Sequence, residues 1–490
     1  MNREFWNMPL TRSRVRSENA GLPEMLFGYL LGPFGALLAS GIFTSILQSY
    51  FTDVLKLDLA FLTGLQLVST VFIVVSNLVV GQLIERTNTM AGKARPWILL
   101  SALTLSLASV LMFIVPFEGV AKMVWIAVAY NLYYAVAYPI YNTANSTLIP
   151  LSTRNSQQRG SLASFTNMAG LGVMGAGSMV FPILVSFALK ENQYLWFVAM
   201  LAVAIFSGLT IYLQYLFTRE RVTEELAAQA QKQQGKKSSV SLAGQLQAVT
   251  GEKMWWIVMM FYLCYQWAGA LKNGSMTFFC KWVLDNAFFG TADAWGAAQS
   301  LLSILGAVPM AAAAVVVAPL CNRFGKRLVC MIGMLVGAAG GVIAGLGGSN
   351  IVPVASGVAL KCLGSAPACY MILALLADVI DHIEYKKGIR TDGLTMSIYS
   401  SVMVAATPIC NAIFSALLSA SGYDQNADVA MGILAQTAGA KAAISASYIW
   451  VETIGFVICA VLIFFFTIEK DLPAEQAAIA QRNATEGAKN

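Results

Sequence analysis

The segments GQLIERTNTMAGKARPW, at residues 81–97, and APLCNRFGKRLVC, at residues 318–330, are both short, basic and glycine-containing turns. Each overlaps the end of an apolar run, 59–84 in the first case and 295–320 in the second. Each of these runs is also the second one in its own half of the chain. This weak internal repeat indicates two halves with matching topology.

Working outward from these turns, twelve apolar runs follow one another along the chain. Each reaches or exceeds the roughly 20 residues that a helix needs to cross about 30 Å of hydrocarbon. They lie near 27–52, 59–84, 96–116, 123–150, 161–189, 194–217, 254–280, 295–320, 328–348, 351–378, 393–420 and 446–468. We therefore predict an all-α membrane protein with twelve transmembrane helices in two six-helix halves.

The composition supports this fold class. Of the 490 residues, 57% are hydrophobic and 11% are charged, whereas a soluble domain carries about 25% charged residues. This scarcity of charge excludes a cytosolic enzyme, a nucleic-acid-binding protein and a disordered scaffold. The chain also lacks a phosphate-binding loop, zinc-ligand spacing and a nucleophile elbow, so we expect a protein that is not an enzyme and holds no cofactor or metal.

Lysine and arginine predict the topology. They cluster in alternate polar segments, whereas the segments between these clusters hold at most one lysine each and no arginine. Because positively charged loops of membrane proteins are mostly cytoplasmic, both termini are predicted to face the cytoplasm. The predicted parts are a cytoplasmic N-terminus (1–26), a first half (27–217), a cytoplasmic linker (218–253), a second half (254–468) and a cytoplasmic tail (469–490). Two such halves favour the major facilitator architecture, with substrate bound between them near the midplane.

Three segments resemble those of one transporter family. They are GKARPWILLSA (92–102), AYNLYYAVAYPIYNTANSTLIPLSTRNSQQRGSLASF (129–165) and LADVIDHIEYKKGIRTDGLTMSIYS (376–400). Together they resemble the glycoside–pentoside–hexuronide:cation symporters, the family of the melibiose permease. The resemblance implies import of a sugar, glycoside or hexuronide across a bacterial inner membrane by alternating access, with Na⁺ or H⁺ as the coupling ion. We expect a multi-pass monomer in the lipid bilayer.

The third segment is interpreted as a polar loop between two spans. Its opposite charges can pair across adjacent helix ends, and the resemblance implies that such pairs form a cytoplasmic gate. The residues alone leave open a solvated loop that only sets the topology. The predicted gate residues are Arg95, Asp378, Asp381, Glu384, Lys386 and Arg390. His382, the one histidine of the chain, is interpreted as an ordinary residue of this loop.

The second apolar run departs from the family pattern. The resemblance implies two acidic residues one helical turn apart as a cation site, but Ile73 and Asn77 stand at those positions. Ser76 and Asn77 are left as the polar residues at the cation-site positions. On the fourth and fifth runs, the family's acid and arginine positions hold Asn142 and Asn167. A proton-coupled carrier and an uncoupled facilitator of the same substrates therefore remain open.

Neutral polar side chains line the runs instead. Amides and aromatic rings suit a sugar, which has apolar C–H faces and hydroxyl rims, although they also serve as packing groups between membrane helices. The predicted substrate-binding residues of this kind are Gln48, Tyr138, Tyr141, Asn142, Asn145, Asn167, Gln266 and Asn273.

Two lysines, Lys272 and Lys361, complete the predicted substrate site. At 1.5 Å rise per residue both lie roughly 12–15 Å from the outer surface, where a charge costs at least about 2.5–3.5 kcal/mol. Glu452, at the outer end of the last run, is interpreted as interfacial. Two unpaired positive charges would favour an anionic substrate, but internal pairing, snorkelling and a role as proton acceptor or tethered cation also remain open. A lysophospholipid carrier is the alternative from another substrate class.

Overall fold

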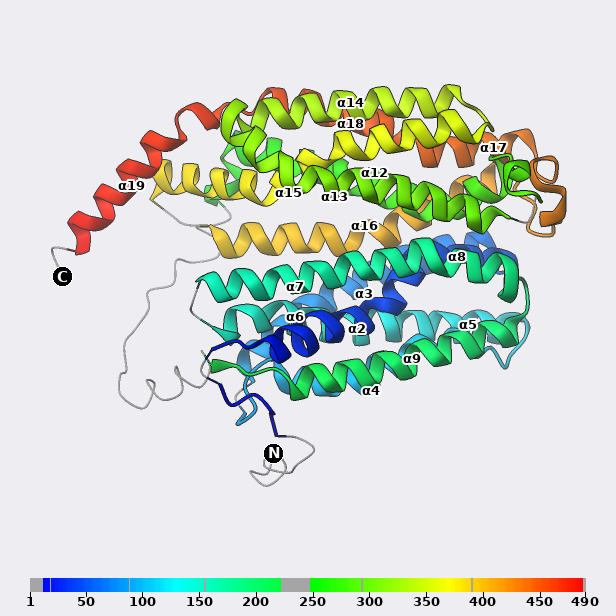
Figure 1. Ribbon diagram of the computed structural model, residues 1–490, viewed down its shortest axis with the longest axis horizontal. Helices are drawn as coiled ribbons and strands as arrows, with labels where there is room; N and C mark the ends of the chain where they lie inside the picture. Colours follow the sequence, from blue (N-terminus) through cyan, green and yellow to red (C-terminus); the bar gives the residue numbers. More distant parts are fainter. Residues whose placement is uncertain are drawn as a thin grey trace. The chain divides into compact units, whose positions relative to one another are not determined.

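The computed structural model describes residues 12–17, 19–87, 89–153, 156–221, 247–291, 294–388 and 391–487. Within these ranges the regular elements are helices, apart from one isolated bridge between Thr89 and Gly92. The chain divides into two compact units, Met1–Lys236 and Lys237–Asn490, and each unit is a bundle of long helices (Figure 1). Residues 222–246 of the predicted linker lie outside the described residues.

The N-terminal unit contains several continuous helices in which α-helical and π-helical segments follow each other without a turn. Its helices are η1 (Glu24–Leu31), α2 (Gly32–Ile42), η2 (Phe43–Leu47), η3 (Tyr50–Val54), α3 (Leu59–Arg86), α4 (Arg95–Leu111), α5 (Gly119–Asn131), η4 (Leu132–Ala137), α6 (Tyr138–Ser152), α7 (Ser156–Gly175), η5 (Ala176–Val180), α8 (Phe181–Leu184), η6 (Val185–Leu189) and α9 (Gln193–Leu216). Short polar residues precede two of the uninterrupted α-helices: Asp58 caps α3 and Asn192 caps α9 by accepting backbone N–H groups.

The C-terminal unit has longer α-helices. Its helices are α12 (Lys253–Trp282), η7 (Asn286–Phe289), α13 (Trp295–Phe324), α14 (Lys326–Leu346), α15 (Ile351–Lys387), α16 (Asp392–Ala420), η8 (Val429–Leu434), α17 (Ala438–Ser445), η9 (Ala446–Trp450), α18 (Val451–Phe464), η10 (Ile468–Lys470) and α19 (Leu472–Gly487). Asn350 caps α15 through the backbone N–H of Val352.

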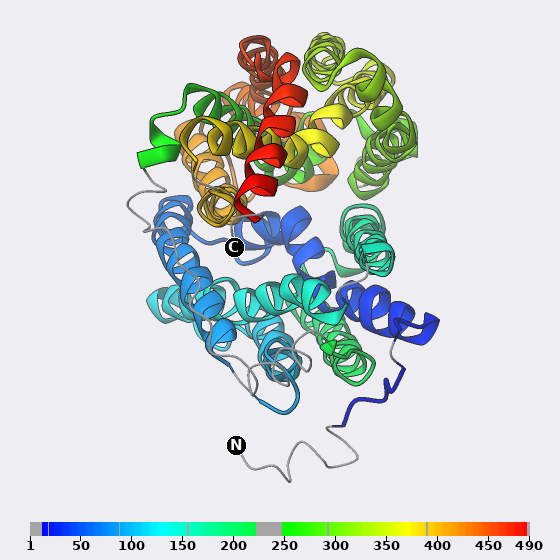
Figure 2. The ribbon, with the colours of Figure 1, turned by 90° about the vertical axis from the view of Figure 1, so that its left-hand side faces the viewer.

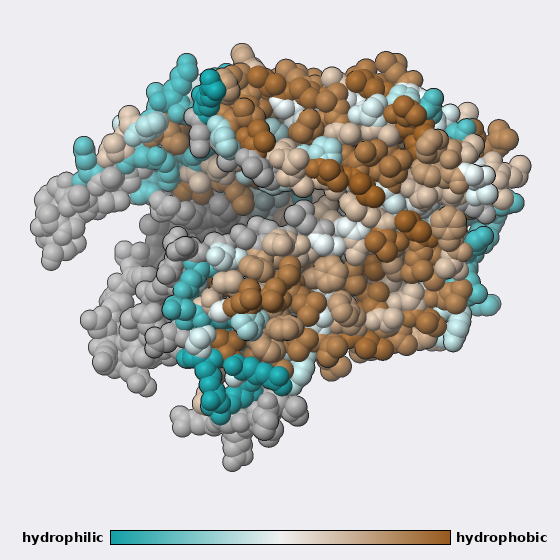
Figure 3. Space-filling view, in the orientation of Figure 1, coloured by the Kyte–Doolittle hydropathy of each residue, from teal (hydrophilic) through white to brown (hydrophobic). Residues whose placement is uncertain are grey.

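Eleven helical spans in the described part of the chain are long and apolar enough to cross a membrane. The predicted third span corresponds to α4, which is apolar but only 17 residues long. Large apolar side chains such as Val71 and Leu103 are exposed on the outside of the bundles. In Figure 3 hydrophobic residues cover the middle of the helices and hydrophilic residues gather toward their ends. This surface is that of a protein solvated by lipid.

Glycines bring α14 and α15 into backbone contact. A Cβ atom on Gly340 would lie 2.6 Å from the backbone nitrogen of Lys361 and 2.7 Å from the carbonyl oxygen of Gly357. Small residues at such positions let membrane helices approach closely enough for van der Waals packing to hold them together. The close approach fixes the backbone of α15 at Lys361.

The polar segment at the end of α15 corrects one prediction. Residues 378–387 continue the helix rather than forming a loop, and the chain turns only at Gly388, which adopts the left-handed conformation with φ 68°. His382 is therefore a buried helical residue, and its Nδ1 lies 2.9 Å from the carboxylate of Glu475 on α19. Figure 2 shows α19 lying across the ends of the helices of its own unit. Part of the predicted tail is thus a docked helix.

Candidate functional site

Three charged side chains meet inside the C-terminal unit. The carboxylate of Glu452, on α18, lies 2.5 Å from Nζ of Lys361 on α15 and 3.5 Å from Nζ of Lys272 on α12. The side chains of Lys361 and Glu452 are 2% and 6% exposed, whereas that of Lys272 is 21% exposed. The structure thus brings together the two lysines that were predicted from the sequence.

Aromatic and backbone groups hold Lys361 from the other side. Its Nζ donates to the carbonyl oxygen of Tyr448 at 3.2 Å and lies 5.6 Å from the centroid of the Tyr448 ring. That ring stacks on Phe279 of α12, with 4.5 Å between the centroids. A buried ammonium group needs such partners because its charge has lost its water.

Helix α14 positions both sides of this charged cluster. The Gly340 edge of α14 touches the backbone of α15 at Lys361, and a Cβ atom on Gly337 would lie 2.9 Å from the ring of Phe456 on α18. Lys361 and Glu452 are therefore carried by helices that both pack against the glycines of α14, since a Cβ atom on Gly337 would also lie 3.3 Å from the carbonyl oxygen of Lys361. Their separation is set by backbone packing as well as by charge.

The pairing of Glu452 corrects the interpretation of this residue as interfacial. The apolar run predicted a helix over 446–468, but the continuous helical segment begins at Ala438. Glu452 consequently lies about 20 Å along the helix from its first residue and is buried. The two lysines are not unpaired, although one carboxylate serves both of them and the cluster keeps one excess positive charge.

A second polar cluster, with neutral side chains, lies inside the N-terminal unit. The hydroxyl group of Tyr141 donates to Oε1 of Gln214 at 2.8 Å, and Nε2 of Gln214 donates to Oδ1 of Asn145 at 2.8 Å. Nearer the start of the chain, Nε2 of Gln66 donates to Oε1 of Gln48 at 2.8 Å. Tyr141, Asn145 and Gln48 thus all form hydrogen bonds between helices, the alternative use left open for such groups.

The other predicted binding residues differ in exposure. Tyr138 and Asn142 on α6, and Gln266 and Asn273 on α12, are all half-buried. Half-buried polar groups can exchange water for the hydroxyl groups of a ligand without leaving a buried partner unsatisfied. Asn167 belongs to α7, and its side chain lies outside those that the structure describes.

The two positions predicted from the family cation site lie on α3. Ser76 and Asn77 are half-buried, and Nδ2 of Asn77 donates to the carbonyl oxygen of Ile73 at 2.8 Å. Ile73 itself is buried and apolar. The amide oxygen of Asn77 is the one side-chain carbonyl oxygen that these three positions offer to a cation.

The two units share an arrangement at their helix ends. The carboxylate of Glu220 accepts the backbone N–H groups of Lys93, Ala94 and Arg95 at 2.8–2.9 Å. In the C-terminal unit the carboxylate of Glu469 accepts those of Lys326 and Arg327 at 2.5 and 3.0 Å. A carboxylate stabilises a helix N-terminus by both hydrogen bonding and charge. The basic turns of the sequence repeat therefore have equivalent partners.

The matching arginines extend this equivalence. The guanidinium group of Arg95 lies 4.7 Å from the ring centroid of Tyr215, and Nη2 donates to the Tyr215 carbonyl oxygen at 2.9 Å. The guanidinium group of Arg327 lies 5.2 Å from the ring centroid of Phe464 and also donates to the Phe464 carbonyl oxygen. Each unit thus ties the start of one helix to the end of another in the same way.

Comparison with known proteins identifies the family. Residues 28–470 match the family described as MFS/sugar transport protein. The chain belongs to the MFS/sugar transport protein family. It is 29% identical to the isoprimeverose transporter of Lactiplantibacillus pentosus, over 94% of this chain and 92% of that protein. It is 25% identical to the glucuronide carrier protein homolog of Escherichia coli (strain K12), over 83% and 87% of the two chains.

A solved structure supports the fold of this MFS/sugar transport protein. The nucleoside transporter NupG superposes with a TM-score of 0.60 at 14% identity, and the match covers 91% of this chain and 97% of that one. The predicted resemblance to melibiose-permease-like symporters is confirmed by the family match and the relatives. The prediction of a transporter rather than an enzyme is also confirmed, because the matched family is one of transport proteins.

The residues predicted as a gate in this MFS/sugar transport protein bind groups within their own unit. Asp378 lies 2.7 Å from Nζ of Lys326, and Lys386 lies 3.4 Å from Glu252. Asp381 accepts a hydrogen bond of 2.8 Å from Gln476 of α19, and Glu384 is buried. Arg390 lies outside the described residues. Their role as a gate stays a prediction.

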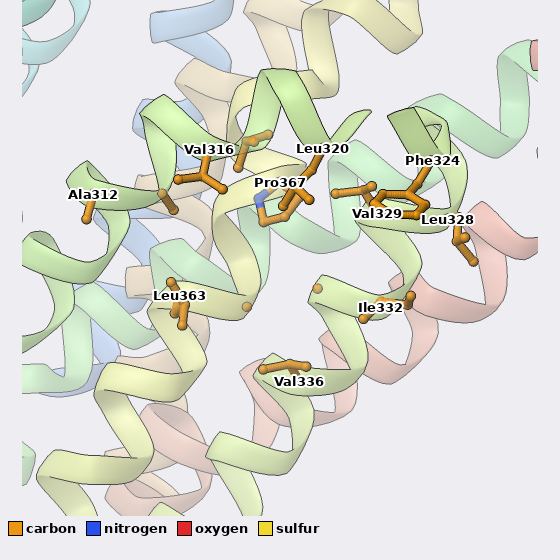
Figure 4. A pocket seen from close by; sticks show the side chains of 14 residues that line it. Ala312, Val316, Leu320, Phe324, Leu328, Val329, Ile332, Val336, Leu363 and Pro367 are labelled. Atoms are coloured by element: carbon orange, nitrogen blue, oxygen red, sulfur yellow. The ribbon is translucent and has the colours of Figure 1, made fainter. Parts of the chain in front are cut away.

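A pocket in the C-terminal unit is unsuited to sugar. It has a volume of about 710 Å³ and lies between α13, α14 and α15, where Figure 4 shows side chains such as Val316, Ile332 and Leu363. All fourteen residues that line it are apolar. Sugar sites need a few placed polar groups to fix the hydroxyls, so the charged cluster and the half-buried amides remain the candidates in this MFS/sugar transport protein.

Proposed function

We propose that this protein imports a sugar or glycoside across a bacterial inner membrane by alternating access. The observation that carries the proposal is the match to the isoprimeverose transporter, which extends over nearly the full length of both chains. The half-buried amide and tyrosine side chains supply hydrogen-bonding and stacking groups that suit such a substrate.

The topology is part of the same proposal. Helix α4 serves as the third of twelve spans, and its short length is compensated by a thinner local bilayer or by flanking polar residues. Both termini face the cytoplasm, as the distribution of lysine and arginine favours. We further propose that the protein acts as a monomer, because the six-helix halves alone supply the two elements that alternate access requires.

An acidic substrate is the second candidate within this function. The excess positive charge at Lys272, Lys361 and Glu452 favours an anion, and one relative is named a glucuronide carrier homolog. A neutral sugar would instead use the ammonium group of Lys272 as a hydrogen-bond donor to its hydroxyls.

The test is exchange transport by the purified protein in liposomes. Vesicles loaded with isoprimeverose, a phenyl glucuronide or a lysophospholipid are diluted into trace amounts of the same labelled compound, so that no ion gradient is needed. We expect saturable exchange of one of the two sugars. Exchange of the lysophospholipid alone would refute the proposal, and protein-free vesicles provide the baseline.

A further inference from the structure

The charged cluster at Lys272, Lys361 and Glu452 has an unbalanced charge. When all three side chains are ionised, the cluster carries one net positive charge inside an apolar bundle. Protonation of Glu452 would increase this charge, whereas loss of one proton from either lysine would remove it. A buried charge without a partner is costly, so a closed, empty cluster favours the state with one proton fewer.

The geometry separates the two lysines by their access to water. Lys361 is almost fully buried and has two oxygen partners, one from Glu452 and one from the Tyr448 backbone. Lys272 is 21% exposed, and its contact with Glu452 is longer by 1.0 Å. Lys272 is thus the member through which a proton can reach the cluster from water, while Glu452 links it electrostatically to Lys361.

Few other titratable groups face this cluster in the described residues. Tyr265 and Cys362 lie within its electrostatic range on α12 and α15, and Tyr448 lies beside it on η9. None of these is an ordinary proton acceptor at neutral pH. Two lysines sharing one carboxylate titrate together, so the proton that is lost belongs to the cluster rather than to either residue alone.

We propose that the Lys272–Glu452–Lys361 cluster binds the proton that drives transport. This inference rests on the proposed sugar import and names its coupling ion. A hydronium ion on the outer side transfers its proton to the neutral lysine amine, so that an N–H bond forms, an O–H bond breaks and one water molecule is left behind. On the inner side the same N–H bond breaks, and the proton returns to water as the cluster becomes neutral again.

Substrate oxygen atoms link the proton to transport. The neutral, empty cluster can be closed off from water without an uncompensated charge. The protonated cluster can be closed off from water only when a ligand replaces the water around the exposed Lys272 ammonium group. Hydroxyl or carboxylate oxygens of the substrate supply that replacement, so closure is favoured when both proton and substrate are bound and when neither is.

Sodium has poorer ligands at the described positions. The carboxylate of Glu452 is already shared by two ammonium groups. Ile73, at one of the positions predicted from the family cation site, is apolar, and Asn77 offers a single amide oxygen there, since its Nδ2 donates to the carbonyl oxygen of Ile73. Hard cations require several oxygen ligands in the same place. The charged cluster is therefore better suited to bind a proton than a sodium ion.

The test compares Lys272→Gln and Lys361→Gln with the unchanged protein in liposomes. Each variant keeps one lysine paired with Glu452, which makes the cluster neutral and leaves no excess proton to lose. Because Lys272 also contacts the substrate in this proposal, the accumulation of each variant is divided by the exchange rate of the same variant. We expect this ratio to fall by more than about tenfold in both variants when a proton gradient is imposed. Lys281→Gln removes a lysine from the same helix, outside the cluster, and should keep proton-driven accumulation.

Three outcomes would overturn the inference. The first is accumulation by Lys272→Gln and Lys361→Gln in response to a proton gradient, which would mark the cluster as structural only. The second is accumulation driven by sodium alone in the unchanged protein. The third is sugar uptake by the unchanged protein without any change of internal pH, measured with a pH-sensitive dye inside the vesicles. Failure of the unchanged protein to exchange any sugar would instead refute the proposed function.

Discussion

The hydrogen bonds of the Glu220 carboxylate predict how much local stability the start of α4 loses when this charge is removed. One of its oxygens accepts the N–H groups of Ala94 and Arg95, and the other accepts that of Lys93. In Glu220→Gln the amide oxygen can keep the first two bonds. The amide nitrogen, a donor, then faces the N–H of Lys93, so this hydrogen bond and the negative charge are both lost.

The expected loss follows from these two terms. A hydrogen bond to a charged group contributes about 1.5–3 kcal/mol, and a charge at a helix N-terminus contributes about 0.3–1 kcal/mol. Because Glu220 is only 1% exposed, solvent screening reduces these values little. The start of α4 should therefore lose about 2–4 kcal/mol of local stability.

Hydrogen exchange measures this loss where it occurs. Since 1.4 kcal/mol is a factor of ten, the backbone amides of residues 93–98, apart from Pro96, should exchange about 30- to 700-fold faster in Glu220→Gln. Glu118→Gln is the matched control, because Glu118 is exposed and makes no side-chain hydrogen bond at the start of α5. Exchange at 93–98 that is equal in Glu220→Gln, Glu118→Gln and the unchanged protein would refute the reasoning.

Three other changes test packing elsewhere in the bundles. Gly340→Ala puts a methyl group 2.6–2.7 Å from backbone atoms of α15, so the free energy of unfolding should fall by about 1–3 kcal/mol. Gly269→Ala is the control, because a Cβ atom there has nothing within 4 Å, and it should not lower the melting temperature. Glu475→Gln weakens the contact with His382 and should speed hydrogen exchange in α19 selectively; unchanged protection of α19 would contradict that contact. Gln214→Leu leaves two buried polar groups of α6 without their partner, and a melting temperature equal to that of the unchanged protein would disprove the expected loss of about 1–3 kcal/mol.

The sequence predicts the membrane helices well because lipid leaves the backbone little choice. Runs such as 59–84 and 393–420 became α3 (Leu59–Arg86) and α16 (Asp392–Ala420) almost unchanged. The errors occur where a helix continues into water. Polar residues 378–387 extend α15 because helix formation does not require apolar residues once a helix is nucleated and packed. Hydropathy alone does not register such an extension.

The candidate site was predictable only in part. The lysines were singled out by composition, since a charge in an apolar run is rare. Their partner Glu452 was misplaced because small residues 438–445 extend its helix outward and bury it. The pairing between Glu220 and the start of α4 has a weak signal in the repeated FTRE (217–220) and FTIE (466–469), one segment after each half's last span. Contacts between distant segments otherwise need the structure.

The two units share their helix-end pairs, but the polar clusters singled out in their interiors differ in charge. The pairs Gln48–Gln66 and Tyr141–Gln214 of the N-terminal unit are neutral and hydrogen-bonded, so their charge does not change with a single proton. The charge at Lys272, Lys361 and Glu452 does change. A ligand can shift a conformational equilibrium only by its difference in affinity between two states. In the proposed mechanism, the free energy that couples a proton to transport therefore has its source in the C-terminal unit.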